Sequence, residues 1–313
     1  MYLDIKLGEH NARSAEPTML KKSCLWLILT LCMTLSGGYS EATEPKIINE
    51  KDVNSKALEF TCARGREARP TLDPEADQWF QEAIRLYNTG NENFDARAKG
   101  LLLKAAERNH VQALTMYLRA NGADADEAKA VDYAARLIKM DVGMGYYYMG
   151  HFLDRGTGVK QDQGASLVHF IKAAELWNAE GKEEVGKKLL GDFLQTPLRD
   201  QAVPIGIKIL ECSLAQGWAE SGYELSLYFL IIKKDLTAGL QSLQRAAALG
   251  HSLSLYKLSA TFEKGEYGLE KDPIRATCYK TLKEEADADE TKRFPNIDKI
   301  CPLPSRPMPK SPA

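Results

Sequence analysis

One stretch of the sequence decides the fold: MGHFLDRGTGVKQDQGASLVHFIKAAE, residues 149–175. Gly156 and Gly158 suit a helix C-terminus and the turn that follows it, because glycine reaches positive φ without a steric penalty from a Cβ atom. Asp162 suits the N-cap of another helix, since its carboxylate can accept hydrogen bonds from free backbone N–H groups. The stretch therefore predicts a helix, a turn and a second helix.

The same pattern recurs about a hundred residues later, where Gly265 and Gly268 precede Asp272 and Pro273. Proline is favoured at the first position of a helix, because the N–H that it lacks would have no partner there. Partial copies of the second helix occur at residues 104–107, 211–217 and 245–251. The spacing between copies, roughly 33 to 40 residues or twice that, is typical of stacked helical hairpins.

This pattern of a glycine turn, an Asp cap and a closing Lys-Ala-Ala-Glu resembles the Sel1-like repeat, a relative of the tetratricopeptide repeat. Two copies match well and three match in part, between about Asp73 and Ala288. The resemblance implies an all-α fold, a right-handed α-solenoid of stacked helix-turn-helix repeats. It implies protein binding only in general terms, because such repeats serve as scaffolds in otherwise unrelated proteins.

Composition divides the chain into residues 1–42 as a leader, 43–72 as an extended lead-in, 73–290 as the repeat solenoid and 291–313 as a proline-rich tail. A short strand is expected around residues 58–62. Pro197 and Pro204 predict helix breaks and a loose register between residues 181 and 204. The apolar residues of 294–300 predict that the tail lies back along the last repeats, because the ends of a solenoid expose apolar surface.

The leader resembles a secretory signal peptide that starts at Met19. Lys21 and Lys22 precede an apolar run, residues 24–35, which is too short to span a bilayer. Gly38 stands where a bacterial lipobox would have its lipid-accepting cysteine, and cleavage after Ala42 is the simpler interpretation. We therefore expect a periplasmic protein with no integral membrane span, and a lipid anchor is the less favoured alternative.

Four of the six cysteines follow the leader. An even number in an oxidising compartment permits disulfides, and four cysteines allow three complete pairings. Cys278 lies on the last predicted helix and Cys301 on the returning tail, so a bridge between them would hold the cap in place. Cys212 is expected mid-helix, where a small buried thiol is ordinary, and we expect both Cys62 and Cys212 to be free thiols.

The best candidate site is one face of the helix predicted over residues 145–155. On a helix with 3.6 residues per turn, one stripe can pack against a neighbour. A second stripe, left for a partner, contains Tyr148, His151, Phe152 and Arg155. Tyr and Arg are favoured anchors in protein interfaces, so we predict that these four side chains bind a protein along the concave face. Core packing is the competing interpretation of the aromatic residues.

The sequence contains no Gly-x-Ser-x-Gly, His-Glu-x-x-His, Gly-x-x-x-x-Gly-Lys or Cys-x-x-Cys motif. We therefore predict no enzyme activity, no cofactor and no metal site. His110 and His251 occupy the same position in two repeats and are interpreted as turn residues. With 41 basic and 43 acidic residues the net charge is −2, and no block of like charge indicates a nucleic-acid partner.

Three segments beyond the repeats, residues 59–62, 72–77 and 297–304, resemble one group of bacterial Sel1-like proteins. The genes of this group often accompany type VI secretion effectors of the phospholipase kind. The resemblance implies an immunity protein that binds a cognate lipase effector and sterically blocks its active site. A periplasmic scaffold or adaptor for envelope proteins is the alternative, and an enzyme with a site assembled from distant residues has no positive sign in the sequence.

Overall fold

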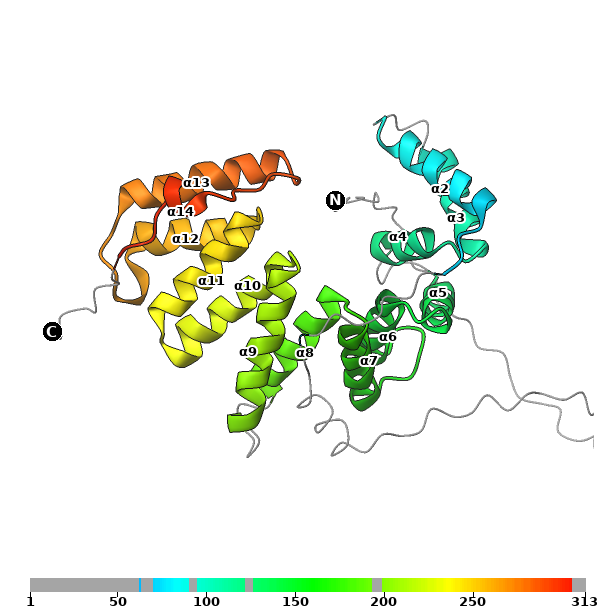
Figure 1. The fold of residues 1–313 in the computed structure, drawn as a ribbon, viewed down its shortest axis with the longest axis horizontal. Coiled ribbons are helices and arrows are strands. Elements are labelled where there is room, and N and C mark those ends of the chain that lie inside the picture. The colour runs from blue at the N-terminus through cyan, green and yellow to red at the C-terminus, as the bar shows by residue number, and fades with distance from the viewer. Residues whose placement is uncertain (1–61, 63–69, 90–94, 122–125, 193–198, 306–313) are drawn as a thin grey trace, which may run out of the picture. The chain divides into compact units, whose positions relative to one another are not determined.

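The computed structural model describes residue 62 and residues 70–89, 95–121, 126–192 and 199–305 (Figure 1). Within those ranges every regular element is a helix. The first helices are α2 (Pro74–Tyr87), α3 (Asp95–Glu107), α4 (Val111–Asn121), α5 (Glu127–Lys139), α6 (Gly143–Arg155), α7 (Gln163–Glu175) and α8 (Ala179–Gly191). They are followed by α9 (Arg199–Ala215), α10 (Ala219–Leu227), the π-helix η3 (Tyr228–Lys233), α11 (Leu236–Ala248), α12 (Ser252–Lys264), the 3₁₀-helix η4 (Glu266–Gly268), α13 (Pro273–Ala288) and α14 (Ile297–Ile300).

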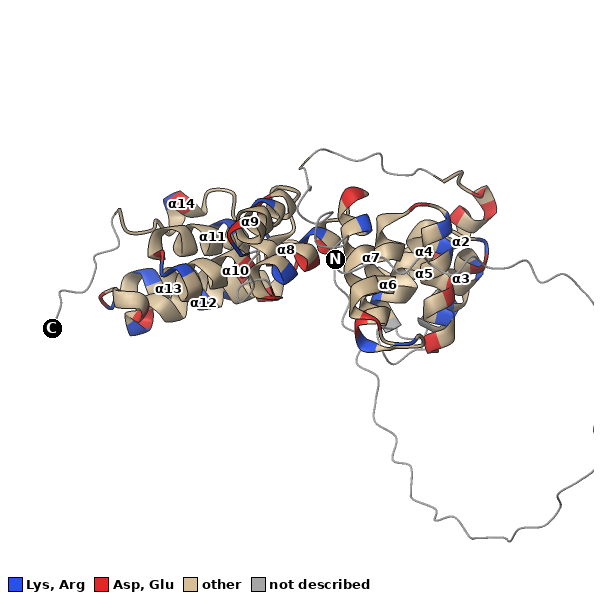
Figure 2. Ribbon diagram, turned by 90° about the horizontal axis from the view of Figure 1, so that it is seen from below, with Lys and Arg blue, Asp and Glu red and all other residues tan. Residues whose placement is uncertain are grey.

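The long helices pair as hairpins along the chain: α2 with α3, α4 with α5, and so on to α12 with α13. Each hairpin also packs on the next, because the second helix of one contacts the first helix of its successor. The first helices of neighbouring hairpins touch as well, as α4, α6, α8 and α10 do in turn. The predicted all-α solenoid of stacked hairpins is confirmed. Figure 2 shows basic and acidic residues interspersed along the described helices.

The same backbone conformation recurs at the junctions where one hairpin connects to the next. The residue two positions before each first helix has positive φ, between 55° and 93°, in Asn109, Asp141, Trp177, Gly217 and Gly250. The following residue donates its backbone N–H to a carbonyl five residues earlier, at 3.0–3.3 Å in all five junctions. This 6→1 bond is the one that ends a helix in a Schellman motif. His110 and His251 occupy this same junction position, as predicted.

Aspartates begin most of the second helices. Asp162 and Asp272 each accept from the backbone N–H three residues on, at 2.9 Å, which confirms the caps predicted from the sequence. Asp126 and Asp235 do the same for α5 and α11. Asp73 caps α2 with Pro74 at the first helical position. Each cap satisfies an N–H group that the helix itself leaves free.

The predicted loose register between residues 181 and 204 is wrong over its described part. α8 is regular from Ala179 onward and includes Gly181, and α9 continues through Pro204. A proline inside a helix costs about 3 kcal/mol. Val203, Ile209 and Leu210 are buried around it, so packing of α9 against its neighbours outweighs that cost. Pro197 and the lead-in up to residue 69, apart from Cys62, lie outside the described residues, as do the leader with Met19 and Gly38, and most of the expected strand.

The segment after α13 returns over the last hairpin. Phe294, Ile297 and Cys301 are buried in one apolar cluster with residues of α11, α12 and α13. The Phe294 N–H donates to the Ala248 carbonyl at 2.8 Å. The Cys301 carbonyl accepts from Tyr279 Oη at 2.7 Å and from Gln244 Nε2 at 2.9 Å. These bonds and the buried side chains hold the returning segment, as far as residue 305, against the final repeat.

Two disulfides join cysteines within the described residues. Cys278 of α13 is bonded to Cys301 of the returning segment, and their Cα atoms are 5.9 Å apart. Cys62 is bonded to Cys212 of α9, also with 5.9 Å between the Cα atoms, so the expectation that both are free thiols is wrong. The mid-helix position of Cys212 suggested a buried thiol. Cys212 is only 8% exposed, but its sulfur faces the side of α9 that Cys62 reaches.

Candidate functional site

The placement of α6, which carries the predicted site residues, depends on two glycines. A Cβ atom on Gly145 would lie 2.5 Å from Leu137 Cβ of α5. A Cβ atom on Gly150 would lie 2.6 Å from the Phe170 ring of α7. Because real Cβ atoms do not approach so closely, only glycine allows α6 to pack tightly on both neighbours. Tyr147 and His151 are among the larger side chains of α6 that line the side meeting α8.

A pocket of about 350 Å³ lies between α6 and α8, and we call it the α6–α8 pocket. It is lined by Tyr147, Tyr148, His151, Phe152, Arg155, Thr157, Glu183 and Glu184. The structure therefore brings all four predicted residues to one place. It adds Tyr147, the turn residue Thr157 and two carboxylates of α8, which the sequence analysis did not select.

The expectation that Phe152 points away from the core is wrong. Phe152 is 7% exposed and belongs to a buried cluster that includes Leu114, Tyr133 and Leu137. A helical wheel assigns one packing stripe to a helix, whereas α6 contacts α4, α5, α7 and α8. An inner helix of a solenoid therefore buries a wider arc than the wheel allows. Phe152 forms a wall of the pocket, and Arg155 is the exposed member of the predicted set.

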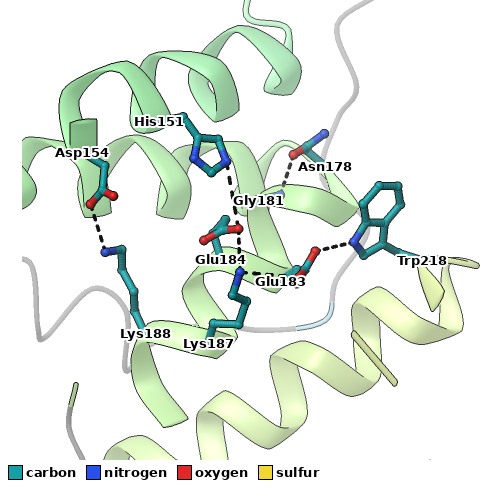
Figure 3. Close-up of polar contacts among 9 residues, drawn as sticks. All are labelled: His151, Asp154, Asn178, Gly181, Glu183, Glu184, Lys187, Lys188 and Trp218. Atoms are coloured by element: carbon teal, nitrogen blue, oxygen red, sulfur yellow. Dashed lines mark hydrogen bonds and ion pairs between the residues drawn. The ribbon is translucent and has the colours of Figure 1, made fainter. Parts of the chain in front are cut away.

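His151 is held in an aromatic environment beside an acid. Its ring lies 4.6 Å from that of Tyr147 and 5.0 Å from that of Phe170, both nearly perpendicular to it. Its Nε2 atom is 4.0 Å from Glu184 Oε1, beyond hydrogen-bonding distance (Figure 3). Burial lowers the pKa of His151 more than Glu184 raises it. At neutral pH the imidazole is therefore uncharged, and it serves the pocket as an aromatic surface with polar edges.

Carboxylates of α8 surround a lysine on the same face. Lys187 Nζ lies 3.1 Å from Glu184 Oε1 and 3.7 Å from Glu183 Oε1 (Figure 3). Burial opposes the charge on Lys187, but the two glutamates outweigh it and its pKa is raised. Burial also raises the pKa of Glu183 to about 7, although an indole N–H from Trp218 favours the ionised form. A single ammonium is thus shared between two half-buried carboxyl groups.

The acidic character continues onto α10. Glu220 and Glu224 are half-buried, and burial raises the pKa of both carboxyl groups. Counted from the junction residue, Glu220 stands where Glu180 stands in the preceding hairpin, and Glu224 stands where Glu184 does. In the sequence this signal is an acidic residue two and six positions after Asn178, and again two and six positions after Trp218. A search for catalytic motifs could not find it, because the signal appears only when the repeats are superimposed.

This arrangement is suited to binding. Among the described residues no three His, Cys, Asp or Glu side chains are placed to hold a metal ion, and no helix is long and apolar enough to cross a membrane. The pocket offers aromatic rings, an exposed guanidinium at Arg155 and the carboxylates of Glu183 and Glu184. Aromatic and arginine side chains of this kind are the usual anchors of protein interfaces.

Comparison with known proteins supports the same fold. The family model for the Sel1 repeat matches residues 92–110, 143–176, 220–251 and 252–277. A solved structure of PA5086 from Pseudomonas aeruginosa is 28% identical, with a TM-score of 0.60 over 79% of this chain and 96% of that one. The immunity protein PA5088 from the same organism is 25% identical, with a TM-score of 0.60 over 79% and 94%. The immunity protein PA5087, also from that organism, is 28% identical, with a TM-score of 0.59 over 79% and 96%. No protein with a curated description matches the chain.

Proposed function

Because this chain contains Sel1 repeats, we propose that it acts by binding another protein, and specifically as an immunity protein that neutralises a toxic effector. The observation that carries the proposal is the likeness to PA5087 and PA5088, which are named as immunity proteins. Each is at least 25% identical and is matched over 94% or more of its own length. The likeness therefore covers the whole repeat array and not one shared hairpin.

We further propose that the effector is a lipase of the phospholipase type delivered by type VI secretion. The support is the resemblance of residues 59–62, 72–77 and 297–304 to Sel1-like proteins encoded beside such effectors. Such enzymes act on membrane lipids, so an inhibitor that meets them in the periplasm protects the cell before damage occurs. The basic residues before the apolar run at 24–35 support export to that compartment.

The proposed mechanism is steric. The α6–α8 pocket offers an exposed cation at Arg155 together with the rings of Tyr147 and Tyr148, all on helices held rigidly by the stack. A side chain or loop of the effector seated there would place the bulk of the repeat array over the effector's surface. Inhibition then needs no chemistry from this chain, only an interface large enough to persist. Stable protein interfaces bury about 1,200–2,000 Å² in total, so the pocket is one anchor of a wider contact.

The experiment is a rescue assay. A candidate phospholipase-type effector is directed to the periplasm of a bacterial host, alone or together with the full chain. Survival and co-purification of the two proteins are expected with the full chain. A chain that starts at residue 43 without a signal peptide should fail to rescue, which tests the compartment separately. Cell death in the presence of the full chain, with no effector co-purified, would refute the immunity role.

A further inference from the structure

A second pocket, of about 300 Å³, opens where α8, α9, α10 and η3 meet, and we call it the η3 groove. Its floor is buried and apolar, since Leu210 is 0%, Tyr228 4% and Leu190 7% exposed. Its rim is also apolar but lies in solvent, because Ile231 is 56% and Ile232 45% exposed. Single exposed apolar residues are common on protein surfaces. Two neighbouring exposed isoleucines beside an apolar cavity instead indicate a contact surface.

The exposed isoleucines result from an irregular end to α10. The nine residues of α10 and the six of η3 make a first helix of fifteen residues, against thirteen in α6, α8 and α12. The extra length is taken up by π-helical turns, and the chain leaves through Lys234 at φ 56°. π-Helical turns are rare in proteins and are frequently found at functional sites. Here the irregularity carries Ile231 and Ile232 beyond the packed part of the hairpin.

Among the described residues, the charged side chains that line this groove are one carboxylate and one ammonium, and only the ammonium is engaged in ion pairs. Glu224 lines the groove, and Glu220 lies one turn earlier on α10. Within the described part of the chain neither carboxylate has a basic group within the 4.0 Å of an ion pair. Lys187, the one cation that lines the groove, already lies against Glu183 and Glu184. Burial raises the pKa of both carboxyl groups, and at Glu224 the attraction of Lys187 does not offset it.

We propose that the η3 groove binds a segment of the partner protein in which an apolar side chain stands next to a lysine or arginine. The apolar side chain would enter over Leu210 and Tyr228, and the cation would reach Glu224. The proposal rests on the binding role proposed above and adds the chemistry of the partner. A volume near 300 Å³ is at the small end of ligand sites and suits one or two side chains.

The test uses three amphipathic peptides that share the same leucines and carry lysine, glutamine or glutamate at the remaining positions. Binding to the full chain is measured by fluorescence anisotropy at low ionic strength. We expect the lysine peptide to bind at least tenfold more tightly than the glutamine peptide. Ile231→Ser and Glu224→Gln should each weaken it at least fivefold. The matched controls are Ile274→Ser, at a residue 85% exposed on α13, and Glu263→Gln, at an exposed residue of α12, and both should bind as the wild type does.

Three results would overturn the proposal. The first is equal or absent binding of the lysine and glutamine peptides. The second is groove variants that bind the lysine peptide as well as the controls do. The third is a dimer in sedimentation velocity that Ile231→Ser dissociates, since this would assign the groove to a second copy of the chain. The assay contains no effector, so its outcome is separate from that of the rescue assay.

Discussion

The indole Nε1 of Trp218 lies 2.5 Å from Oε2 of Glu183, which joins the residue before α10 to the middle of α8. On the other side Arg119 of α4, two hairpins earlier, reaches Glu180 of α8 at 2.7 Å. The acidic side chains of α8 therefore bond to hairpins on both sides, while Glu183 and Glu184 also face Lys187. The same row of carboxylates stabilises the stack and forms the surface that we assign to binding.

Glu183 should make stability depend on pH. Its side chain is 12% exposed and its pKa is raised from 4.5 to about 7. Between these values the folded state binds more protons than the unfolded state, so stability falls as the pH rises. Relative to Glu183→Gln, the wild type should lose about 2 kcal/mol of unfolding free energy between about pH 5 and about pH 8, since one pKa unit is worth about 1.4 kcal/mol. Urea unfolding at both pH values measures this, and a constant difference would contradict it.

The pocket residues should divide into a packing group and a contact group. Phe152→Ala should lower the free energy of unfolding by about 3–5 kcal/mol, because it empties a buried aromatic site. Arg155→Ala should leave unfolding unchanged and weaken effector binding more than tenfold, as truncation of an anchor costs about 2 kcal/mol. Denaturant melts and binding isotherms on both variants test this. If Arg155→Ala binds within threefold of the wild type, the contact lies elsewhere.

The glycines of α6 should be irreplaceable where a glycine in α3 is not. In Gly145→Ala the new Cβ would meet Leu137 Cβ at 2.5 Å and the backbone nitrogen of Ile138 at 2.7 Å, so overpacking should cost about 1–3 kcal/mol. Gly100 has no atom within 4 Å of such a Cβ and lies within α3. Gly100→Ala should therefore stabilise the protein by about 0.5–1 kcal/mol. Thermal melts of the pair would contradict this account if both changes had the same sign.

The disulfide on α13 should hold the returning segment in place. Cys278 and Cys301 are 23 residues apart in sequence, and closing a loop of that size stabilises by about 3 kcal/mol in the chain-entropy estimate. Replacing both cysteines with serine should lower the unfolding free energy by that order. It should also speed hydrogen exchange at the Phe294 and Cys301 amides, which donate to Ala248 and Ile297. Unchanged exchange at these amides would show that packing alone holds the segment.

The sequence predicted the hairpins because their signals are local. Asp162 and Asp272 cap helices whatever surrounds them. Gly156 ends α6 at φ 75°, a conformation that glycine adopts because it has no Cβ atom. The burial of Phe152 was missed because it depends on helices from other hairpins, which a wheel drawn for one helix ignores. The Cys62–Cys212 bond joins residues 150 positions apart, so no spacing rule could select it among three pairings. The π-helical end of α10 follows from a two-residue excess that is visible only after the hairpins are aligned.

The bond between Cys278 and Cys301 also has a mechanical consequence. A machine that grips the chain beyond residue 305 and pulls can draw out residues only as far as Cys301 before the load passes through sulfur to α13. Peeling residue by residue then stops, and α13 must be torn from α12 as a unit. A protease that degrades a protein from its free C-terminal end would therefore be blocked by this disulfide at the last hairpin. At the opposite end Cys62 precedes the helices and is bonded to Cys212, so a pull applied before residue 62 would pass directly to α9 and bypass α2 to α8.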